Sequence, residues 1–408
     1  MAGGLPPLTW VAAHAGLAAA ALSRRLGLGA GSMIGGRVTM RLDATALSNL
    51  AAGRRVVLVS GTNGKTTTSH LVAAALGTAG SVAHNDSGSN MADGVIAALA
   101  RRRDAPFAVL EVDELHLAAV ADAVDPAVVV LLNLTRDQLD RTSEVRQTAA
   151  AIGDALARLP GAVVIANADD PMTVAAARAA RLPVWVRGGA SWRADVASCP
   201  SCGELLEYDE QGGWSCRCGL RRPEPSWWLC GDVAHTAGRS VPLSLQLPGR
   251  INFGNATMAL AAVEALGVPG DAAARAFAGL REVAGRYATV QRGSQTLRLL
   301  LAKNPAGWVE TFPVLTEPRP LVLSVNARAA DGRDTSWLWD VPFEQITPRP
   351  MVATGERAAD LGARLSYADL DHRTTADLAS ALACLPAGPV DVVANYTAFH
   401  QLRRELRP

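Results

Sequence analysis

The sequence of 408 residues is 49% hydrophobic and 19% charged, which is enough apolar material for more than one buried core. We therefore expect two or three domains. The formal net charge of +1 argues against broad electrostatic capture of nucleic acid. Six cysteines in a chain of this length do not indicate a secreted disulfide scaffold.

An apolar stretch from Leu8 to Leu22, interrupted by His14, lies near the start of the chain. It is too short to span a bilayer comfortably. Its basic residues, Arg24 and Arg25, follow the apolar part, which is the reverse of a signal peptide. We predict an alanine-rich amphipathic helix that either packs on the body of the protein, the commoner fate, or touches the membrane surface.

Residues 56–71, VVLVSGTNGKTTTSHL, contain an apolar run, a glycine-rich turn and a helix-like segment in succession. The apolar run predicts a buried parallel strand, and the turn can present backbone N–H groups to an anion. We expect Gly61 and Gly64 to let the backbone approach a nucleotide phosphate. Lys65 would then reach the β- and γ-phosphates, and the Thr66 hydroxyl would ligate Mg²⁺.

Three further apolar runs end in polar residues, at 107–117, 126–141 and 161–171. Ligands bind at the carboxyl ends of the strands in an open α/β sheet, so these runs predict a nucleotide-binding parallel sheet. The first run ends in Glu111 and Asp113, where such a sheet places its metal carboxylate. Later, residues 249–268 have the apolar spacing of a helix, with Asn255 near its start, and N-capping is the structural alternative for this asparagine.

Four cysteines form two short motifs, Cys-Pro-Ser-Cys-Gly and Cys-Arg-Cys-Gly, which thirteen residues separate. The glycine after each motif permits a tight turn that points backbone N–H groups at thiolate sulfur. Four thiolates are typical of a structural zinc ribbon and leave no coordination position open for catalysis. The predicted zinc ligands are Cys199, Cys202, Cys216 and Cys218. We predict that Cys230 and Cys384 are buried spectators.

The loop reads Ser-Gly-Thr-Asn-Gly-Lys-Thr-Thr, with Val59 where the strict Walker spacing has a glycine. In this form it resembles the loop of the Mur ligase and folylpolyglutamate synthetase superfamily, and the resemblance to the central ATPase domain of Mur ligases covers roughly residues 50–285. It implies that Glu111 binds Mg²⁺ with Thr66 and that Asn255 contacts adenine. The implied ATP-binding residues are Gly61, Thr62, Asn63, Gly64, Lys65, Thr66, Thr67 and Asn255, with Arg286 added from the C-terminal domain.

Two departures separate the chain from the amino-acid-adding Mur ligases. Gln138 replaces a histidine that helps to hold magnesium in those enzymes, and only about fifty residues precede the loop, where they have a domain that grips a UDP-sugar. The ribbon, LAKNPAGW (301–308) and ADGRDTSWLWDVPFE (330–344) look like the MurT family, the ligase subunits of lipid II isoglutaminyl synthase.

That narrower resemblance implies an ATP-dependent carbon–nitrogen ligase of peptidoglycan synthesis. It would convert the α-carboxyl of D-glutamate in the lipid II stem peptide to an amide through an acyl phosphate. Asp334 is implied to complete the catalytic triad of a separate GatD-type glutaminase subunit that supplies ammonia. The chain has no Gly-x-Cys-x-Gly nucleophile elbow, so a partner must release the ammonia. The structural alternative for Asp334 is a turn residue that caps a short helix containing Trp337 and Trp339.

The predicted architecture is α/β. A helical segment (1–49) precedes a Mur ligase-like P-loop ATPase domain with a central parallel sheet (50–283), into which the zinc ribbon (about 195–225) is inserted. A smaller α/β domain (284–408) follows and contacts the glutaminase. We expect a cytoplasmic enzyme that uses ATP, Mg²⁺ and Zn²⁺, with contact to the inner face of the membrane left open and no nucleic acid partner.

Two other functions stay open. One is a self-sufficient Mur- or folylpolyglutamate-type ligase that joins an amino acid to a carboxylate. The other is a zinc-ribbon ATPase that binds nucleic acid. The acidic residues around the ribbon, such as Glu204 and Glu207, offset its arginines and count against the second.

Overall fold

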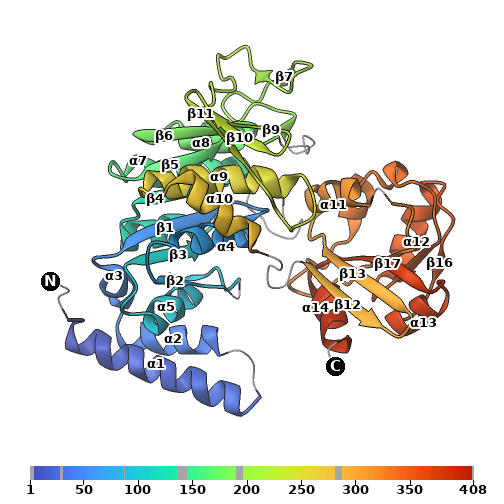
Figure 1. The fold of residues 1–408 in the computed structure, drawn as a ribbon, viewed down its shortest axis with the longest axis horizontal. Helices are drawn as coiled ribbons and strands as arrows, with labels where there is room; N and C mark the ends of the chain where they lie inside the picture. The colour runs from blue at the N-terminus through green and yellow to red at the C-terminus, as the bar shows by residue number, and fades with distance from the viewer. Residues whose placement is uncertain are drawn as a thin grey trace. The chain divides into compact units, whose positions relative to one another are not determined.

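The computed structural model describes residues 4–27, 31–86, 88–136, 145–189, 196–280, 287–315 and 317–406. They form two compact units (Figure 1). Unit 1 comprises Met1–Leu134, Glu144–Gln246 and Ile251–Arg281; unit 2 comprises Thr135–Ser143, Leu247–Arg250 and Glu282–Pro408.

A nine-stranded sheet forms the centre of unit 1, in the order β11-β10-β9-β6-β5-β4-β1-β3-β2. Pairing is parallel from β2 to β9 and antiparallel from β9 to β11. The strands are β1 (Arg55–Ser60), β2 (Val82–His84), β3 (Phe107–Glu111), β4 (Val128–Leu131), β5 (Val163–Asn167), β6 (Leu182–Arg187), β9 (Trp227–Cys230), β10 (Val233–Thr236) and β11 (Arg239–Pro242). The predicted central parallel sheet is confirmed.

Helices cover both faces of this sheet (Figure 1), which explains why β1, β3 and β4 are almost continuously apolar. One core lies under α4 (Lys65–Leu76), α9 (Ile251–Ala265) and α10 (Gly270–Ala278). The other lies under α3 (Ala46–Ala51), α5 (Ala92–Arg101), α6 (Leu117–Val124), α7 (Val145–Ala157) and α8 (Pro171–Ala177). The predicted N-terminal helix is α1 (Pro7–Arg25), and it packs against α2 (Ser32–Leu42) outside α5.

Unit 2 has a six-stranded sheet in the order β12-β13-β17-β14-β15-β16, with all pairs parallel except β12–β13. Its strands are β12 (Tyr287–Arg292), β13 (Gln295–Leu301), β14 (Leu321–Ser324), β15 (Met351–Thr354), β16 (Arg373–Thr374) and β17 (Gly388–Ala394). Its helices are α11 (Pro305–Thr311), α12 (Ala358–Tyr367), α13 (Leu378–Ala383) and α14 (Tyr396–Glu405), with 3₁₀ turns η2 (Phe312–Val314), η3 (Ser336–Asp340) and η4 (Phe343–Gln345). Strand order reverses direction at β14, so the carboxyl ends of β14 and β17 form a topological switch point.

Among the helices that the structure describes, none is long and apolar enough to cross a bilayer.

Candidate functional site

The phosphate loop, residues 61–66, connects β1 to α4. Gly61 and Gly64 have φ angles of 133° and 86°, a region that side-chain-bearing residues rarely adopt. A Cβ atom at Gly61 would lie 2.9 Å from the main-chain N and O of Asn133, and one at Gly64 would lie 2.8 Å from Oδ1 of Asn255. Both glycines are therefore required by backbone conformation and by the close approach of a neighbour.

Asn133, which follows β4, braces the loop from the side. Its main-chain O accepts a hydrogen bond from the Thr62 N–H at 2.9 Å, and its Oδ1 accepts one from the Asn63 N–H at 2.9 Å. Its Nδ2 donates in return to the main-chain O of Asn63 at 3.0 Å. Sequence reasoning noted the polar turn after this strand but did not single out Asn133. Two N–H groups of the loop are thus engaged by the protein itself.

Lys65 is buried, and a carboxylate balances its charge. The ammonium Nζ donates to the main-chain O of Gly61, to that of Thr62 at 3.3 Å, and to Oε2 of Glu114 at 3.1 Å. The Lys65 and Glu114 side chains are only 5% and 12% exposed, so this ion pair is largely shielded from water. Glu114 was not predicted, although it lies in the acidic segment after β3.

Glu111 ends β3, opposite Val59 of β1, and holds an unsatisfied oxygen. Its main-chain N–H and C=O are paired with the side-chain amide of Asn85, each at 2.8 Å. Its Oε2 is buried and has no hydrogen-bond partner among the described residues. A buried carboxylate oxygen without a partner is costly, and a hard cation is the partner that it would accept best. The carboxylate at the end of β3 therefore offers an oxygen of the kind that Mg²⁺ prefers.

Asn255 is buried inside α9, which begins at Ile251, and its amide is close to Gly64. The N-capping alternative for this residue is wrong because the helix starts four residues earlier. Its Nδ2 donates to Oδ1 of Asn252 at 3.3 Å, which orients the amide at the loop. The structure thus brings together the loop, Glu111 and Asn255 in unit 1.

The turn after β5, by contrast, has structural partners. Asp170 caps α8 by accepting the Thr173 N–H at 2.9 Å, and its other oxygen accepts the Leu134 N–H at 2.9 Å. Asp169 accepts the Gly189 N–H at 2.8 Å. These carboxylates fix the turn in place.

The four predicted zinc ligands converge in unit 1. Their sulfur atoms all lie within 4.8 Å of one another, with Sγ–Sγ distances of 3.6 Å for Cys199–Cys218 and 3.4 Å for Cys202–Cys216. A disulfide would bring two sulfurs to about 2.05 Å. Tetrahedral zinc with Zn–S bonds of about 2.3 Å implies sulfurs about 3.8 Å apart, close to the spacing seen here.

The backbone around the cysteines has the geometry that the sequence predicted. Gly203 and Gly219 have φ angles of 84° and 90°, and the Ser201 N–H donates to Sγ of Cys199 at 3.4 Å. The hairpin between the motifs is formed by β7 (Glu207–Tyr208) and β8 (Trp214–Ser215). Four converging thiols with an N–H donor to sulfur fit a structural metal ion.

The ribbon is docked on the turn after β5. Trp214 donates its Nε1–H to the main-chain O of Ala168 at 3.1 Å, and Arg222 lies 3.6 Å from Asp169. Trp214 is buried with Val174 of α8 in a small separate core. The insert is therefore anchored to the ATPase sheet by both apolar and polar contacts.

Asp334 is exposed in unit 2, and its Oδ1 accepts the Ser336 N–H at 2.8 Å at the start of η3, which contains Trp337 and Trp339. The hydrogen bonds from Ser336 lower the pKa of the Asp334 carboxyl, and the charge of Arg357 adds to this effect. The capping contact of the structural alternative is present, and the carboxylate is also ionised and accessible.

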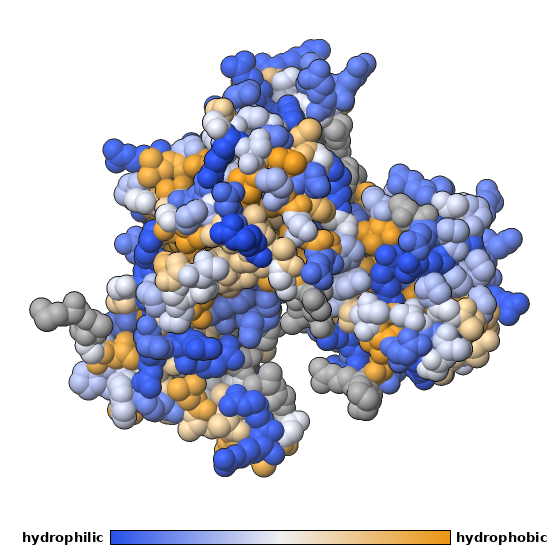
Figure 2. Space-filling model, in the orientation of Figure 1, coloured by the Kyte–Doolittle hydropathy of each residue, from blue (hydrophilic) through white to orange (hydrophobic). Residues whose placement is uncertain are grey.

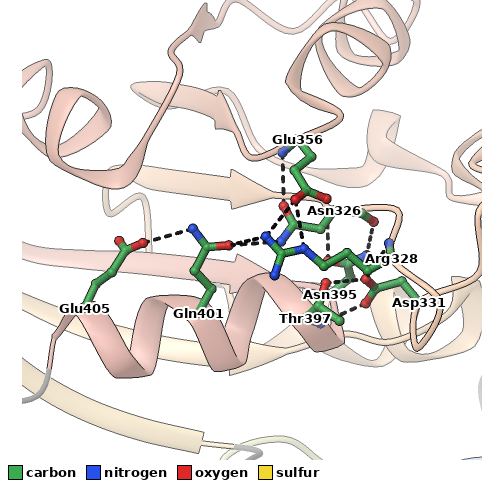
Figure 3. Close-up of polar contacts among 8 residues, drawn as sticks. All are labelled: Asn326, Arg328, Asp331, Glu356, Asn395, Thr397, Gln401 and Glu405. Atoms are coloured by element: carbon green, nitrogen blue, oxygen red, sulfur yellow. Dashed lines mark hydrogen bonds and ion pairs between the residues drawn. The ribbon is translucent and has the colours of Figure 1, made fainter.

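The base of the loop that carries Asp334 is held by a polar network (Figure 3). Asp331 accepts the Thr397 N–H at 2.8 Å through Oδ1 and the Arg328 N–H at 3.1 Å through Oδ2. Asn326 and Asn395, at the ends of β14 and β17, exchange two hydrogen bonds of 3.0 and 2.7 Å. The Asp334 loop is therefore tied to the switch point of the sheet. Sequence reasoning did not identify this network.

Arg286 and Gln138 lie outside the described residues. The prediction that Cys230 and Cys384 are buried is wrong, since both are exposed. Cys230 is the last residue of β9, and Cys384 follows the end of α13, so each lies where its element leaves the core.

Comparison with known proteins gives two family matches. Residues 59–263 match the Mur ligase middle domain, and residues 301–399 match the MurT ligase C-terminal domain. The MurT subunit of lipid II isoglutaminyl synthase (glutamine-hydrolyzing) from Streptococcus pneumoniae is 33% identical over 83% of this chain and 82% of its own length. The corresponding subunit of Staphylococcus aureus strain N315 is 31% identical over 89% of this chain and 88% of its own length.

Among solved structures, a pseudomurein peptide ligase type C from Methanothermus fervidus superposes with a TM-score of 0.69 at 18% identity, over 86% of this chain and 78% of its own. At that identity the match supports the fold alone, and it is the fold of a Mur-type ligase.

Proposed function

Because this chain belongs to the MurT family of Mur ligases, we propose that it is the ATP-dependent ligase subunit of an enzyme that amidates lipid II. The acceptor is the α-carboxyl of the D-glutamate residue of the stem peptide, and the product carries D-isoglutamine. The observation that carries the proposal is the buried Oε2 of Glu111, next to the strand that leads into the phosphate loop, for which the described part of the chain provides no hydrogen-bond partner. A phosphate loop with an adjacent metal carboxylate is the equipment of phosphoryl transfer.

Binding of ATP requires Lys65 to change partners. The ammonium leaves Glu114 and the loop carbonyls for the phosphates, while Asn133 keeps the loop in shape. Asn255, whose amide lies against Gly64, contacts the base. Magnesium, when bound by Thr66 and Glu111, neutralises charge on the β- and γ-phosphates.

The reaction has two steps. An oxygen of the substrate carboxylate attacks the γ-phosphorus, the bond to the bridging oxygen breaks, and ADP leaves with an acyl phosphate formed. Ammonia then attacks the acyl carbon, inorganic phosphate leaves, and the nitrogen loses a proton to give the amide. The role of Lys65 is to hold the transferring group in line and to balance its negative charge.

Ammonia comes from a partner in this proposal. A GatD-type glutaminase subunit hydrolyses glutamine, and Asp334 accepts a hydrogen bond from the partner's catalytic histidine, as the aspartate does in a Ser-His-Asp triad. The exposure and low pKa of the Asp334 carboxyl suit that role, because the residue must be reachable and ionised. The four cysteines hold a structural Zn²⁺ that keeps the ribbon folded. We place the enzyme in the cytoplasm, where ATP is available.

The test compares nitrogen sources. Purified chain is given lipid II, ATP and Mg²⁺ with concentrated ammonium chloride, with glutamine alone, or with glutamine and a candidate glutaminase. Mass spectrometry should find the hydroxyl-to-amide change with ammonium and with glutamine plus partner, and not with glutamine alone. Addition of a free amino acid to a carboxylate acceptor, with no amide under any of these conditions, would favour the self-sufficient ligase instead.

A further inference from the structure

The outward side of α1 carries large apolar side chains. A stripe at intervals of three or four residues, the spacing of one helix face, consists of Leu8, Val11, Ala15, Ala18 and Leu22. Leu8, Val11 and Leu22 are each more than half exposed, as are the neighbouring Trp10 and Leu26. Exposed apolar side chains that gather in one place mark an interaction surface, whereas scattered single ones do not.

Core packing does not explain the stripe, because the opposite face of α1 is already buried. That face is made of small residues, among them Ala12, Ala13 and Gly16, and they pack on α2 and α5. A Cβ at Gly16 would lie 2.5 Å from the main-chain O of Gly35, so α1 and α2 are in close backbone contact. The helix therefore keeps its small residues inside and its large apolar residues outside, the reverse of an ordinary surface helix.

The charged side chains of residues 1–42 are all basic. Residues 1–42 contain four arginines and no aspartate or glutamate, in a chain that has 39 basic and 38 acidic residues overall. Arg24 and Arg25 end α1, and Arg37 and Arg41 are exposed on α2. Two acidic residues contact this segment and are already engaged there: Asp93 pairs with Arg37 at 3.0 Å, and Asp43 is buried against Thr9 and Thr45.

The exposed apolar and basic residues of these two helices make up what we call the N-terminal surface. It consists of Leu8, Trp10, Val11, Leu22, Arg24, Arg25 and Leu26 of the α1 region and Met33, Ile34, Arg37, Met40 and Arg41 of α2. Figure 2 shows hydrophobic and hydrophilic surface side by side over α1 and α2, at the lower left.

We infer that the N-terminal surface binds the surface of an anionic phospholipid bilayer. Leucines and a tryptophan can enter the headgroup boundary, and arginine side chains can extend their charge to the lipid phosphates. A second copy of this chain is a poor alternative occupant, because it would bring the arginines of two such segments together, and residues 1–42 contain no aspartate or glutamate to pair with them. The inference does not rest on the proposed reaction, although binding would place the ligase beside a lipid-linked substrate.

The test is co-sedimentation of the full chain with vesicles, without ATP or lipid II, so that failure of the proposed amidation leaves the result intact. We expect binding to phosphatidylglycerol–phosphatidylcholine vesicles that weakens with salt, and much weaker binding to phosphatidylcholine alone. The double variant Arg24→Gln/Arg25→Gln should bind about 25-fold more weakly, at about fivefold per arginine. Leu8→Glu/Leu22→Glu should abolish binding.

The matched control is Leu182→Glu/Leu205→Glu, which makes the same change at two exposed leucines elsewhere in unit 1 and should bind like the wild type. Circular dichroism checks that each variant folds. If Leu8→Glu/Leu22→Glu does not fold, the result with Arg24→Gln/Arg25→Gln decides. Equal vesicle binding by wild type, stripe variant and arginine variant would overturn the inference. The inference would also be overturned if light scattering finds a dimer that Leu8→Glu/Leu22→Glu dissociates, while no form of the protein binds vesicles.

Discussion

Glu114→Gln tests whether the buried ion pair at the phosphate loop holds Lys65 until nucleotide arrives. The change keeps the shape of the side chain and removes the charge that faces the Lys65 ammonium at 3.1 Å. Removal of one partner of a buried pair costs about 3–5 kcal/mol. Since Lys65 keeps two main-chain carbonyls and Gln keeps an acceptor oxygen, we expect the lower end, about 3 kcal/mol, in the free energy of unfolding of unit 1.

Urea unfolding followed by circular dichroism measures this loss, and repeating it with saturating ATP and Mg²⁺ tests its cause. Phosphate oxygens replace the Glu114 carboxylate as partners of Lys65, so the difference between variant and wild type should shrink when nucleotide is bound. The matched control is Asp122→Asn, which breaks the half-exposed pair with Arg158 and should leave stability unchanged. If Glu114→Gln loses no more stability than the control, or loses the same amount with and without ATP, the ion pair does not hold Lys65 in this way.

Three further predictions concern other groups. Burial, with the charges of His70 and Arg101, lowers the pKa of His84 to about 3. As pH falls below about 6.5, the unfolded chain therefore binds a proton at His84 that the folded chain does not bind, and the folded state loses stability. Between pH 7 and pH 5, urea titrations should show that wild type loses at most about 2 kcal/mol more unfolding free energy than His84→Gln. Asp334→Asn should leave ammonium-driven amidation intact and reduce glutamine-driven amidation on the order of 10⁴-fold, with Asp371→Asn as an inert control; equal loss with both nitrogen sources would make Asp334 a ligase residue. Cys218→Ser should lose one equivalent of zinc, as measured by atomic emission, and should have a lower thermal unfolding midpoint, whereas Cys384→Ser should change neither. Full zinc retention in Cys218→Ser would contradict the ribbon site.

Features encoded locally were predictable from the sequence. The strands β1, β3 and β4 are apolar on both faces because helices cover both, and the turn glycines of the loop and of the ribbon are needed for backbone conformation. The four ribbon cysteines are likewise close together in sequence, so their spacing alone predicts a metal site. These signals predict the parallel sheet and the place of the loop within it.

The partners that complete each feature were not predictable, because folding brings them from distant segments. Asn133 reaches a loop that lies seventy residues earlier, and Thr397 reaches Asp331 from sixty-six residues later. Neither has a local pattern that separates it from an ordinary loop residue. The exposed cysteines were misjudged for a related reason: apolar neighbours in sequence do not show where an element ends.

In the proposed reaction this chain activates a carboxylate as an acyl phosphate and then amidates it. The most direct measurement uses lipid II labelled with ¹⁸O in the D-glutamate α-carboxyl, together with ATP, Mg²⁺ and ammonium. We expect one labelled oxygen to appear in inorganic phosphate for each amide formed, because that oxygen leaves with the phosphoryl group. Amide formation with unlabelled phosphate, or ATP hydrolysis with unchanged lipid II, would contradict it.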